Sequence, residues 1–262
     1  MKKSITQVLC FLVLVSCATG RTEAAPGKNS DSTAAGKSAA SSALKRAETY
    51  RKRYGVEDVY TKVINNRGEG FEDLYGLRNL RVVLHGVMYR GGANNVFHRT
   101  HPRDNANPLP EDGIENLCKE GFESGNYLYS TRYSSASSKK LCENRLSKTA
   151  HELKYTNRLF DKDADVRKLL GEIHAIASDG SRGPLYSHCW NGWHASGFLA
   201  TVTLRQFCGV SASKAVEYWD KNTDGNNKNK RYEKIRERIR KFKPFSELKI
   251  NEDIKKQICP KV

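Results

Sequence analysis

The chain of 262 residues is long enough for one domain with its own hydrophobic core. Its 45 lysine and arginine residues outnumber its 29 aspartate and glutamate residues, and the formal net charge of +16 favours an anionic partner. No nucleic-acid-binding module is recognisable, which argues against nucleic acid as that partner. No apolar segment is long enough to span a membrane as a helix.

The start of the chain has the pattern of a secretory signal. Two lysines precede the apolar run Val8–Val15, which is followed by Ser-Cys. This pattern resembles a bacterial lipoprotein signal. The resemblance implies cleavage of residues 1–16, acylation of Cys17 and, because alanine follows, an outer-membrane location facing the periplasm. We therefore expect a lipid-anchored protein of the cell envelope; the alternative is an ordinary secretory signal with a chance cysteine.

Composition separates a linker from a domain. Residues 18–42 are mostly Ala, Ser, Gly, Thr and Lys, and such a segment buries too little apolar surface to fold. We expect residues 17–50 to form a flexible, lipid-anchored linker, with any helix confined to about 43–60. Residues 51–262 are then the folded domain.

Within this domain, apolar segments and turn signals predict strands that alternate with helices. The first predicted elements are two strands around Gly86 within 80–92 and a helix over 111–119, which Pro110 opens and Gly121 closes. A strand over 127–130 and an exposed polar insertion over 134–148 follow. The last three elements are a helix that begins at Asp163 or Asp165, a strand over 185–187 and a helix over 198–204. Such alternation implies an α/β fold in a single domain, with a mostly parallel central sheet flanked by helices. A ligand would bind at the carboxyl ends of the strands.

The most informative segment is His188–Gly197, where a predicted strand ends in a loop of small residues and a helix begins. In such a loop the backbone N–H groups and the positive end of the helix dipole face the same point, which makes an anion-binding site. Cys189 lies at the mouth of this loop. The same field stabilises a thiolate, the nucleophilic form of cysteine.

This segment resembles the signature loop of the cysteine-dependent protein-tyrosine and dual-specificity phosphatases, His-Cys-x-x-Gly-x-x-Arg-Ser/Thr-Gly. The matching positions are His188, Cys189, Gly192, Ser196 and Gly197. Ala195 replaces the family's arginine. The Tyr-Arg-Gly segment at 89–91 is similar to the opening segment of the atypical dual-specificity phosphatases. The resemblance covers roughly residues 80–219 and implies a phosphatase-like sheet.

The resemblance also implies a reaction and roles for individual residues. Cys189 attacks phosphorus and forms a phosphocysteine, Ser196 helps the thiol leave, and His188 supports the loop through hydrogen bonds. A general acid is expected before the helix that precedes the signature strand, where Asp161 is the first choice and Asp163 the second. The structural alternatives are that Ser196 is an N-cap and that the aspartates are caps or surface charge.

Ala195 leaves the loop without the cation that binds phosphoryl oxygens. Losing one preorganised donor costs about 2.7–4 kcal/mol of transition-state stabilisation, so an unrescued loop would retain little catalysis. His194 could turn inward as a substitute, or Arg90, Arg158 or another distant arginine could reach the loop. Otherwise His194 is a structural imidazole, and the protein binds phosphate-like groups without hydrolysing them.

The remaining loop residues are expected to contact the substrate. They are Trp190, Asn191, Gly192, Trp193 and Ala195. Trp190 and Trp193 suggest an aromatic rim that selects a planar group, unless one of them belongs to the core. We expect no metal and no other cofactor.

Cysteine usage fits an oxidising compartment. Of the seven cysteines, one leaves with the signal, one is acylated and Cys189 is the nucleophile, so four remain and allow three connectivities. We favour Cys118–Cys142 and Cys208–Cys259, because this pairing keeps Cys189 free. The alternative is that several of them are buried thiols.

Basic residues concentrate toward the C-terminus, where nine of them lie between Lys228 and Lys243. Apolar residues at helical spacing over 232–242 predict a helix with a buried stripe and a basic outer face, which would form a C-terminal extension of the domain. Such a face steers polyanions, although it is more often simply solvated.

Three functions remain open. The first is an envelope phosphatase acting on phosphotyrosine, phosphoserine, phosphothreonine or a polyphosphorylated small molecule. The second is a catalytically impaired relative that binds phosphorylated or polyanionic ligands. The third is a cysteine hydrolase of acyl groups, which would need a histidine across a cleft instead of one adjacent in sequence. The family resemblance favours the first.

Overall fold

A computed structural model describes residues 31–262, with side chains described from residue 40. The predicted signal and the acylated Cys17 lie outside the described residues. Among the helices of the described chain, none combines the length and the apolar character needed to cross a membrane.

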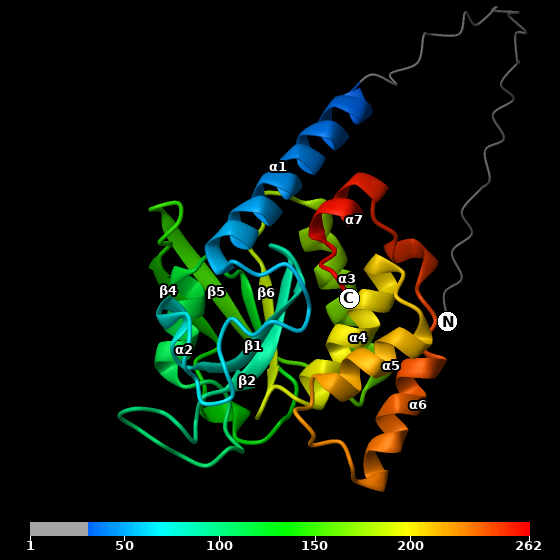
Figure 1. Ribbon diagram of the computed structural model, residues 1–262. Coiled ribbons are helices and arrows are strands. Elements are labelled where there is room, and N and C mark those ends of the chain that lie inside the picture. Colours follow the sequence, from blue (N-terminus) through cyan, green and yellow to red (C-terminus); the bar gives the residue numbers. More distant parts are fainter. Residues whose placement is uncertain (1–30) are drawn as a thin grey trace, which may run out of the picture.

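Six strands form one sheet in the order β1-β2-β6-β3-β5-β4 (Figure 1). The strands are β1 (Leu77–Leu84), β2 (Met88–Ala93), β3 (Ser124–Tyr127), β4 (Lys139–Glu143), β5 (Ala150–Asn157) and β6 (Leu185–Cys189). The four central strands are parallel to one another, and the edge strands β1 and β4 pair antiparallel. The predicted single-domain α/β class with a mostly parallel sheet is confirmed.

Within residues 31–262, seven α-helices surround this sheet. They are α1 (Asp31–Tyr54), α2 (Glu111–Lys119), α3 (Asp163–Ser178), α4 (Ala195–Cys208), α5 (Ala212–Lys221), α6 (Glu233–Lys241) and α7 (Glu252–Ile258). Helices α3 and α4 pack on one face, and α5 and α6 pack outside α4. Helix α2 packs against β4 and β5 on the other face.

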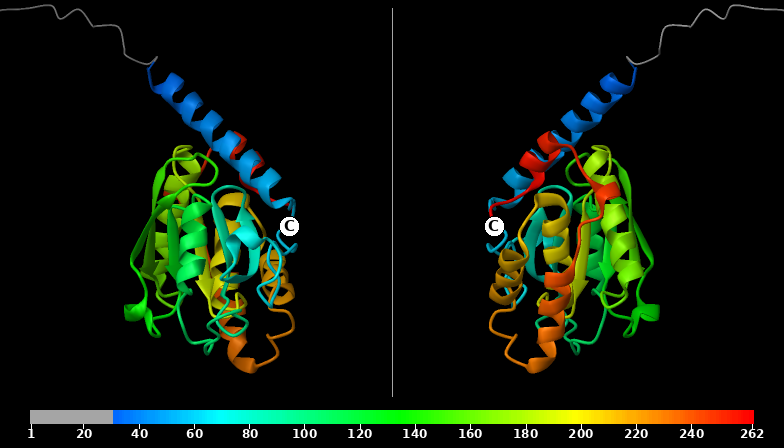
Figure 2. Two further views of the ribbon diagram at one scale, coloured as in Figure 1. Left: turned by 90° about the vertical axis from the view of Figure 1, so that its left-hand side faces the viewer. Right: turned by 90° about the vertical axis from the view of Figure 1, so that its right-hand side faces the viewer.

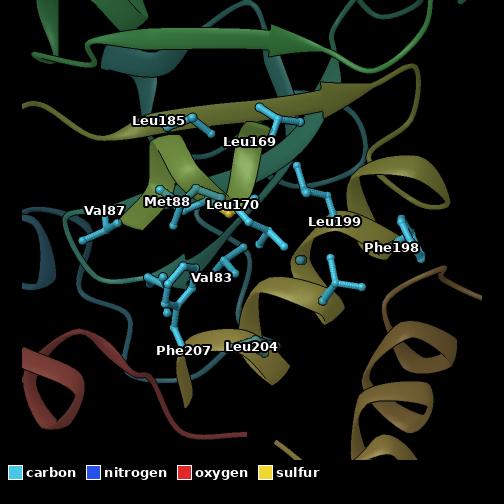
Figure 3. Close-up of a cluster of buried hydrophobic side chains, with 14 of the residues drawn as sticks. Val83, Val87, Met88, Leu169, Leu170, Leu185, Phe198, Leu199, Leu204 and Phe207 are labelled. Atoms are coloured by element: carbon cyan, nitrogen blue, oxygen red, sulfur yellow. The ribbon is translucent and has the colours of Figure 1, made fainter. Parts of the chain in front are cut away.

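The two faces of the sheet bury different side chains. The face under α3 and α4 is aliphatic, and Figure 3 shows its members from the strands and both helices: Val83, Val87, Met88, Leu169, Leu170, Leu185, Phe198, Leu199, Leu204 and Phe207. The opposite face is largely aromatic and includes Tyr89, Phe122, Tyr127, Tyr155 and Tyr186. Alternation along β6 therefore places Cys189 on the aliphatic side and Tyr186 on the aromatic side.

Helix α1 differs from the predicted linker over residues 17–50. It begins at Asp31, inside that segment, and from Ala43 onward it belongs to the core, with Ala43, Ala47 and Tyr50 buried. Alanine is the best helix former, and these residues recur at helical spacing on one face. The segment contains few large apolar residues, but it still forms a packed helix, because its small side chains let the helix lie close to the turns of the sheet.

Helices α1 and α7 cross the amino-terminal ends of the parallel strands. The turn at Gly86 between β1 and β2 lies against Ala47, and the turn before β6 lies against Ser42 and Ala43. Figure 2 shows α7 beside α1 at this end of the molecule and the connection between α5 and α6 at the other. The N-terminal segment therefore leaves the domain at the edge opposite to the carboxyl ends of the strands.

Most local predictions agree with the structure. Helix α2 has the predicted bounds and is followed by Gly121 in a left-handed conformation (φ +77°). The predicted polar insertion instead contains β4, which forms a hairpin with β5; along this edge strand half-exposed and exposed residues alternate, so no apolar pattern marks it. The strand predicted over 127–130 lies earlier, as β3, and α5 and α7 were not predicted.

Two disulfides tie peripheral elements to this core. Cys118 of α2 is bonded to Cys142 of β4, and Cys208 at the end of α4 is bonded to Cys259 after α7. Cys189 is a free, buried thiol. The predicted pairing is confirmed.

Candidate active site

Cys189 is the last residue of β6, the strand between β2 and β3, and α4 begins six residues later at Ala195. The thiol thus lies at the carboxyl end of the parallel sheet, with the N-terminus of α4 next to it. Only 3% of the residue is exposed. The strand, loop and helix predicted for this segment are therefore present.

Glycines allow the loop to pack directly on β2. Gly192 is left-handed (φ +76°), and a Cβ there would lie 2.7 Å from the carbonyl carbon of Gly91. A Cβ on Gly92 would lie 2.5 Å from the carbonyl carbon of Asn191. Both close approaches exclude a side chain, so Gly91-Gly92 on β2 and Gly192 in the loop are matched to each other.

The carbonyl groups of residues 190–192 accept hydrogen bonds from outside the loop. The carbonyl of residue 190 accepts from the backbone N–H of Ala93 at 3.1 Å, and the carbonyls of residues 191 and 192 accept from Nδ2 of Asn79 at 3.1 and 3.2 Å. The carbonyl of residue 192 also accepts from Nη1 of Arg90. These partners hold three successive peptide groups in one orientation.

Most N–H groups of the loop have no such partners. From residue 193 to 197, no backbone N–H donates a hydrogen bond to another described residue, whereas the β-bridge between Gly92 and Asn191 engages the start of the loop. The left-handed Gly192 and the helix start at Ala195 are the two features that turn successive amides toward one point. The loop therefore leaves a set of unpaired donors for an anion, next to the positive end of α4.

Ser196 lies beside the thiol. Its Oγ is 3.4 Å from Sγ of Cys189, and both residues are buried. A hydroxyl at this distance can donate to a sulfur that carries negative charge. The structure thus brings together the predicted nucleophile and the residue predicted to help it leave.

His188 lies beneath the loop, on the aromatic face. Its Nδ1 donates to the carbonyl of Cys189 at 3.1 Å, its Nε2 accepts from the hydroxyl of Tyr155 at 2.6 Å, and its ring stacks on Tyr127 and Tyr186. Complete burial lowers its pKa to about 3. The imidazole is neutral and fully hydrogen-bonded, which is the geometry of a supporting residue.

The His194 side chain is turned toward the connection after α5. Its Nε2 donates to the carbonyl of Asn226 at 2.6 Å, and its ring stacks on Tyr232 with centroids 4.1 Å apart. Burial lowers its pKa, which disfavours the imidazolium form. Of the two alternatives for His194, these contacts agree with the structural imidazole; tertiary packing against the connection after α5 decides its orientation.

Neither predicted general acid forms a hydrogen bond with a described residue of the Cys189 loop. Asp163 is the first residue of α3, its side chain is 94% exposed, and it pairs with Arg238 at 2.9 Å. Asp161 is exposed and makes no hydrogen bond to a described residue. Asp165 accepts from the N–H of Leu159 at 2.9 Å, which ties the preceding loop to α3; the N-cap of α3 is Lys162, without a side-chain cap hydrogen bond, so the predicted capping role of Asp165 is wrong.

A cavity of about 670 Å³ adjoins the loop. Its walls include four loop residues, Trp190, Asn191, Trp193 and His194, and part of the segment 225–235. Both tryptophans are fixed by their indole N–H groups, which donate to the Tyr127 hydroxyl and to Asp224. Among the described residues, no carboxylate lines this cavity.

Of the arginines suggested by the sequence, Arg90 reaches the loop and Arg158 does not. Arg90 is fully buried, donates to the Gly192 carbonyl and from Nε to the Tyr218 hydroxyl at 3.3 Å, and its Nη2 is buried without a hydrogen-bond partner. It supports the loop from behind. Arg158 donates to the carbonyl of Asn157 and does not line the cavity.

Sequence reasoning missed a third arginine, Arg78. It pairs with Gly92 across β1 and β2, and Gly92 bridges to Asn191, so the three residues form one row that ends at the loop. Arg78 is 5% exposed, its Nε is buried without a hydrogen-bond partner, and it has no carboxylate partner within residues 40–262. Burial lowers its pKa, and the charge of Asp224, or of a thiolate at Cys189, opposes that shift. The register of β1 on β2 alone aligns Arg78 with the loop at Asn191.

Comparisons with known proteins give no match, either among protein-family models or among curated sequences. Within the described part of the chain, no group of three or more His, Cys, Asp or Glu residues is placed to hold a metal ion.

Proposed function

We propose that the protein is a cysteine-dependent, phosphatase-like hydrolase of phosphate monoesters that forms a phosphocysteine at Cys189. The observation that supports this proposal is the loop after β6. A free thiol lies in the same loop as the backbone N–H groups of residues 193–197, which have no partner among the described residues, and the carbonyls of 190–192 are held by Ala93 and Asn79. Such a cradle binds the phosphoryl oxygens and stabilises the charge that develops on them.

The reaction proceeds in two steps. The Cys189 thiolate attacks phosphorus, an S–P bond forms, and the P–O bond to the leaving group breaks with its electron pair going to the leaving oxygen. Water then attacks phosphorus, the S–P bond breaks, and inorganic phosphate and the thiolate are released. The Ser196 hydroxyl, 3.4 Å from the sulfur, donates to the thiolate as it leaves.

Arg78 supplies the positive charge that Ala195 cannot. It is a buried guanidinium on β1, in the register row that ends at the loop, and a thiolate at Cys189 would favour its charged form. A charged donor of this kind, acting in a water-poor site, stabilises a transition state far more than it would in water.

The cavity walls favour leaving groups that depart without a proton. No carboxylate of the described chain lines the cavity, so a general acid of the expected kind is missing. Phenolates are stable anions, and aromatic side chains line the cavity. Aryl phosphates are therefore the better substrates, and alkyl phosphates the poorer ones.

The alternative function is binding without turnover. Two observations favour it: Ala195 stands where the cation of the loop is expected, and neither Asp161 nor Asp163 reaches the cavity. The intact cradle would then bind phosphorylated or polyanionic ligands in the cell envelope.

The proposed location is the bacterial envelope, with a lipid on Cys17. Two disulfides suit an oxidising compartment. Helix α1 leaves from the edge opposite to Cys189, so an anchored protein would present its loop away from the membrane. Replacing Cys17 by serine should release the protein from the membrane fraction.

Phosphate release from an aryl phosphate and from an alkyl phosphate tests the function. We expect release from the aryl ester by the unmodified protein and none by Cys189→Ser. The Ser181→Ala variant, a change of an exposed serine far from the loop, serves as the control and should behave as wild type. Phosphate binding without release from either ester would support the binding-only alternative.

A further inference from the structure

We infer that the cavity beside the Cys189 loop binds aryl phosphates that carry a second acidic group. The inference rests on the proposed function in one respect, the placement of the phosphate at the loop. The second acidic group would lie toward the segment 225–235, which supplies the other walls of the same cavity.

Two cations at this segment have no acidic partner. Lys228 and Arg231 line the cavity, and neither forms an ion pair with any carboxylate that the structure describes. Arg231 is held instead by the Tyr232 hydroxyl, to which its Nη2 donates at 2.8 Å, and its guanidinium lies 4.8 Å from the centre of that ring.

The neighbouring cations on α6 behave differently. Each of the following is paired with a carboxylate: Arg236, Arg238, Arg240 and Lys241. The basic segment predicted from the sequence is thus divided. Along α6 the charge is largely neutralised within the protein, whereas at the cavity it is left for a ligand.

The aromatic walls select a ring between the two anionic groups. Tyr129 and Trp190 lie with ring centroids 4.8 Å apart, and Trp193 and Tyr232 line the same cavity. Planar groups pack favourably against such rings. Because Trp190 and Trp193 are fixed by hydrogen bonds to Tyr127 and Asp224, little rotamer entropy is lost when a ring binds.

The volume and charge of the cavity agree with this ligand class. At about 670 Å³ it falls within the usual range of small-molecule sites and exceeds what a phenyl phosphate needs. No described carboxylate lines it, so a second acid meets cations and amides without repulsion.

Binding to Cys189→Ser tests the inference without requiring turnover. The probes are 4-carboxyphenyl phosphate and its neutral counterpart 4-carbamoylphenyl phosphate, measured by calorimetry at low salt. We expect the acid to bind roughly fivefold more tightly, because two exposed cations each contribute a small, salt-sensitive attraction. Lys228→Ala/Arg231→Ala should remove the preference. The matched control, Lys230→Ala/Lys234→Ala, removes two charges that do not line the cavity and should retain it.

The outcomes separate the two claims. Equal binding of the two esters, or a preference that survives Lys228→Ala/Arg231→Ala, overturns the inference. A preference that depends on these cations, together with no phosphate release by the unmodified protein, supports the inference and refutes the proposed hydrolysis. Phosphotyrosine peptides with a neighbouring aspartate or asparagine show whether the aryl phosphate can belong to a protein. If the acid is preferred only among the small esters and not among the peptides, the ligand is a free metabolite.

Discussion

Arg78 gives the sharpest test of the proposed mechanism, because activity and stability should respond in opposite directions. The guanidinium is 5% exposed, its Nε has no hydrogen-bond partner, and no described carboxylate pairs with it. A buried cation without an ion pair costs folding free energy, and here its stacking on the Phe97 ring, 5.0 Å from the guanidinium, and the more distant charge of Asp224 offset part of that cost. A residue retained in such a place serves something other than stability.

We therefore expect Arg78→Met to lower kcat/KM for an aryl phosphate by about 10²–10³, the usual effect of losing one preorganised donor to developing charge. The melting temperature should stay the same or rise, because the variant no longer buries an unpaired charge. Arg78→Lys should recover part of the activity, since it keeps the charge but loses the fork of donors.

Arg67→Met is the matched control. Its guanidinium also lies over the Phe97 ring, at 5.3 Å, but its side chain is 69% exposed and it pairs with Glu69. We expect turnover within twofold of wild type. If Arg78→Met also keeps its kcat/KM within twofold while Cys189→Ser is inactive, Arg78 does not supply the charge and the reasoning fails.

Three further predictions concern the loop and its support. The pKa of His188 is about 3 in the folded protein, against an ordinary value of 6.5, so below pH 6.5 the unfolded chain binds a proton that the folded chain does not. The free energy of unfolding should therefore fall by about 1.4 kcal/mol per pH unit toward pH 3. In thermal melts between pH 7 and 4, His188→Gln should show a smaller loss. Asn79→Ala removes the donor to two loop carbonyls and should cost about 1–3 kcal/mol in urea unfolding and weaken binding of inorganic phosphate; unchanged binding would show that the loop holds its shape without it. Replacing both Cys208 and Cys259 by serine opens a link across 51 residues and should cost about 4 kcal/mol in urea unfolding, whereas a change below 1 kcal/mol would mean that the packing of α7 alone holds this end of the chain.

Local patterns were sufficient for the elements whose signals are local. Pro110 and Gly121 bound helix α2 correctly, because a fixed φ at the start and a left-handed residue after the end act within a few residues. The loop from Cys189 to Ser196 could be placed for the same reason, since a strand, small residues and a helix start follow one another directly. Setting one cysteine aside as the nucleophile left three possible disulfide pairings, and the favoured one is present in the structure.

Edge strands and close-packed alanines escaped this reasoning. Strand β4 has no apolar face, because it is exposed at the edge of the sheet, and α1 packs through small residues such as Ala43 and Ala47, whose contribution depends on what lies against them. Both features become visible only when the neighbouring element is in place.

Tertiary structure, more than the sequence motif, determined which residues surround Cys189. The sequence alone determined that a thiol, a serine and a helix start share one loop, since chain neighbours cannot be separated. It could not determine that Arg78 would come to the loop, that His194 would turn to Asn226, or that Asp163 would pair with Arg238. Strand register and helix packing join residues that are far apart in the chain, and each of these contacts depends on that joining.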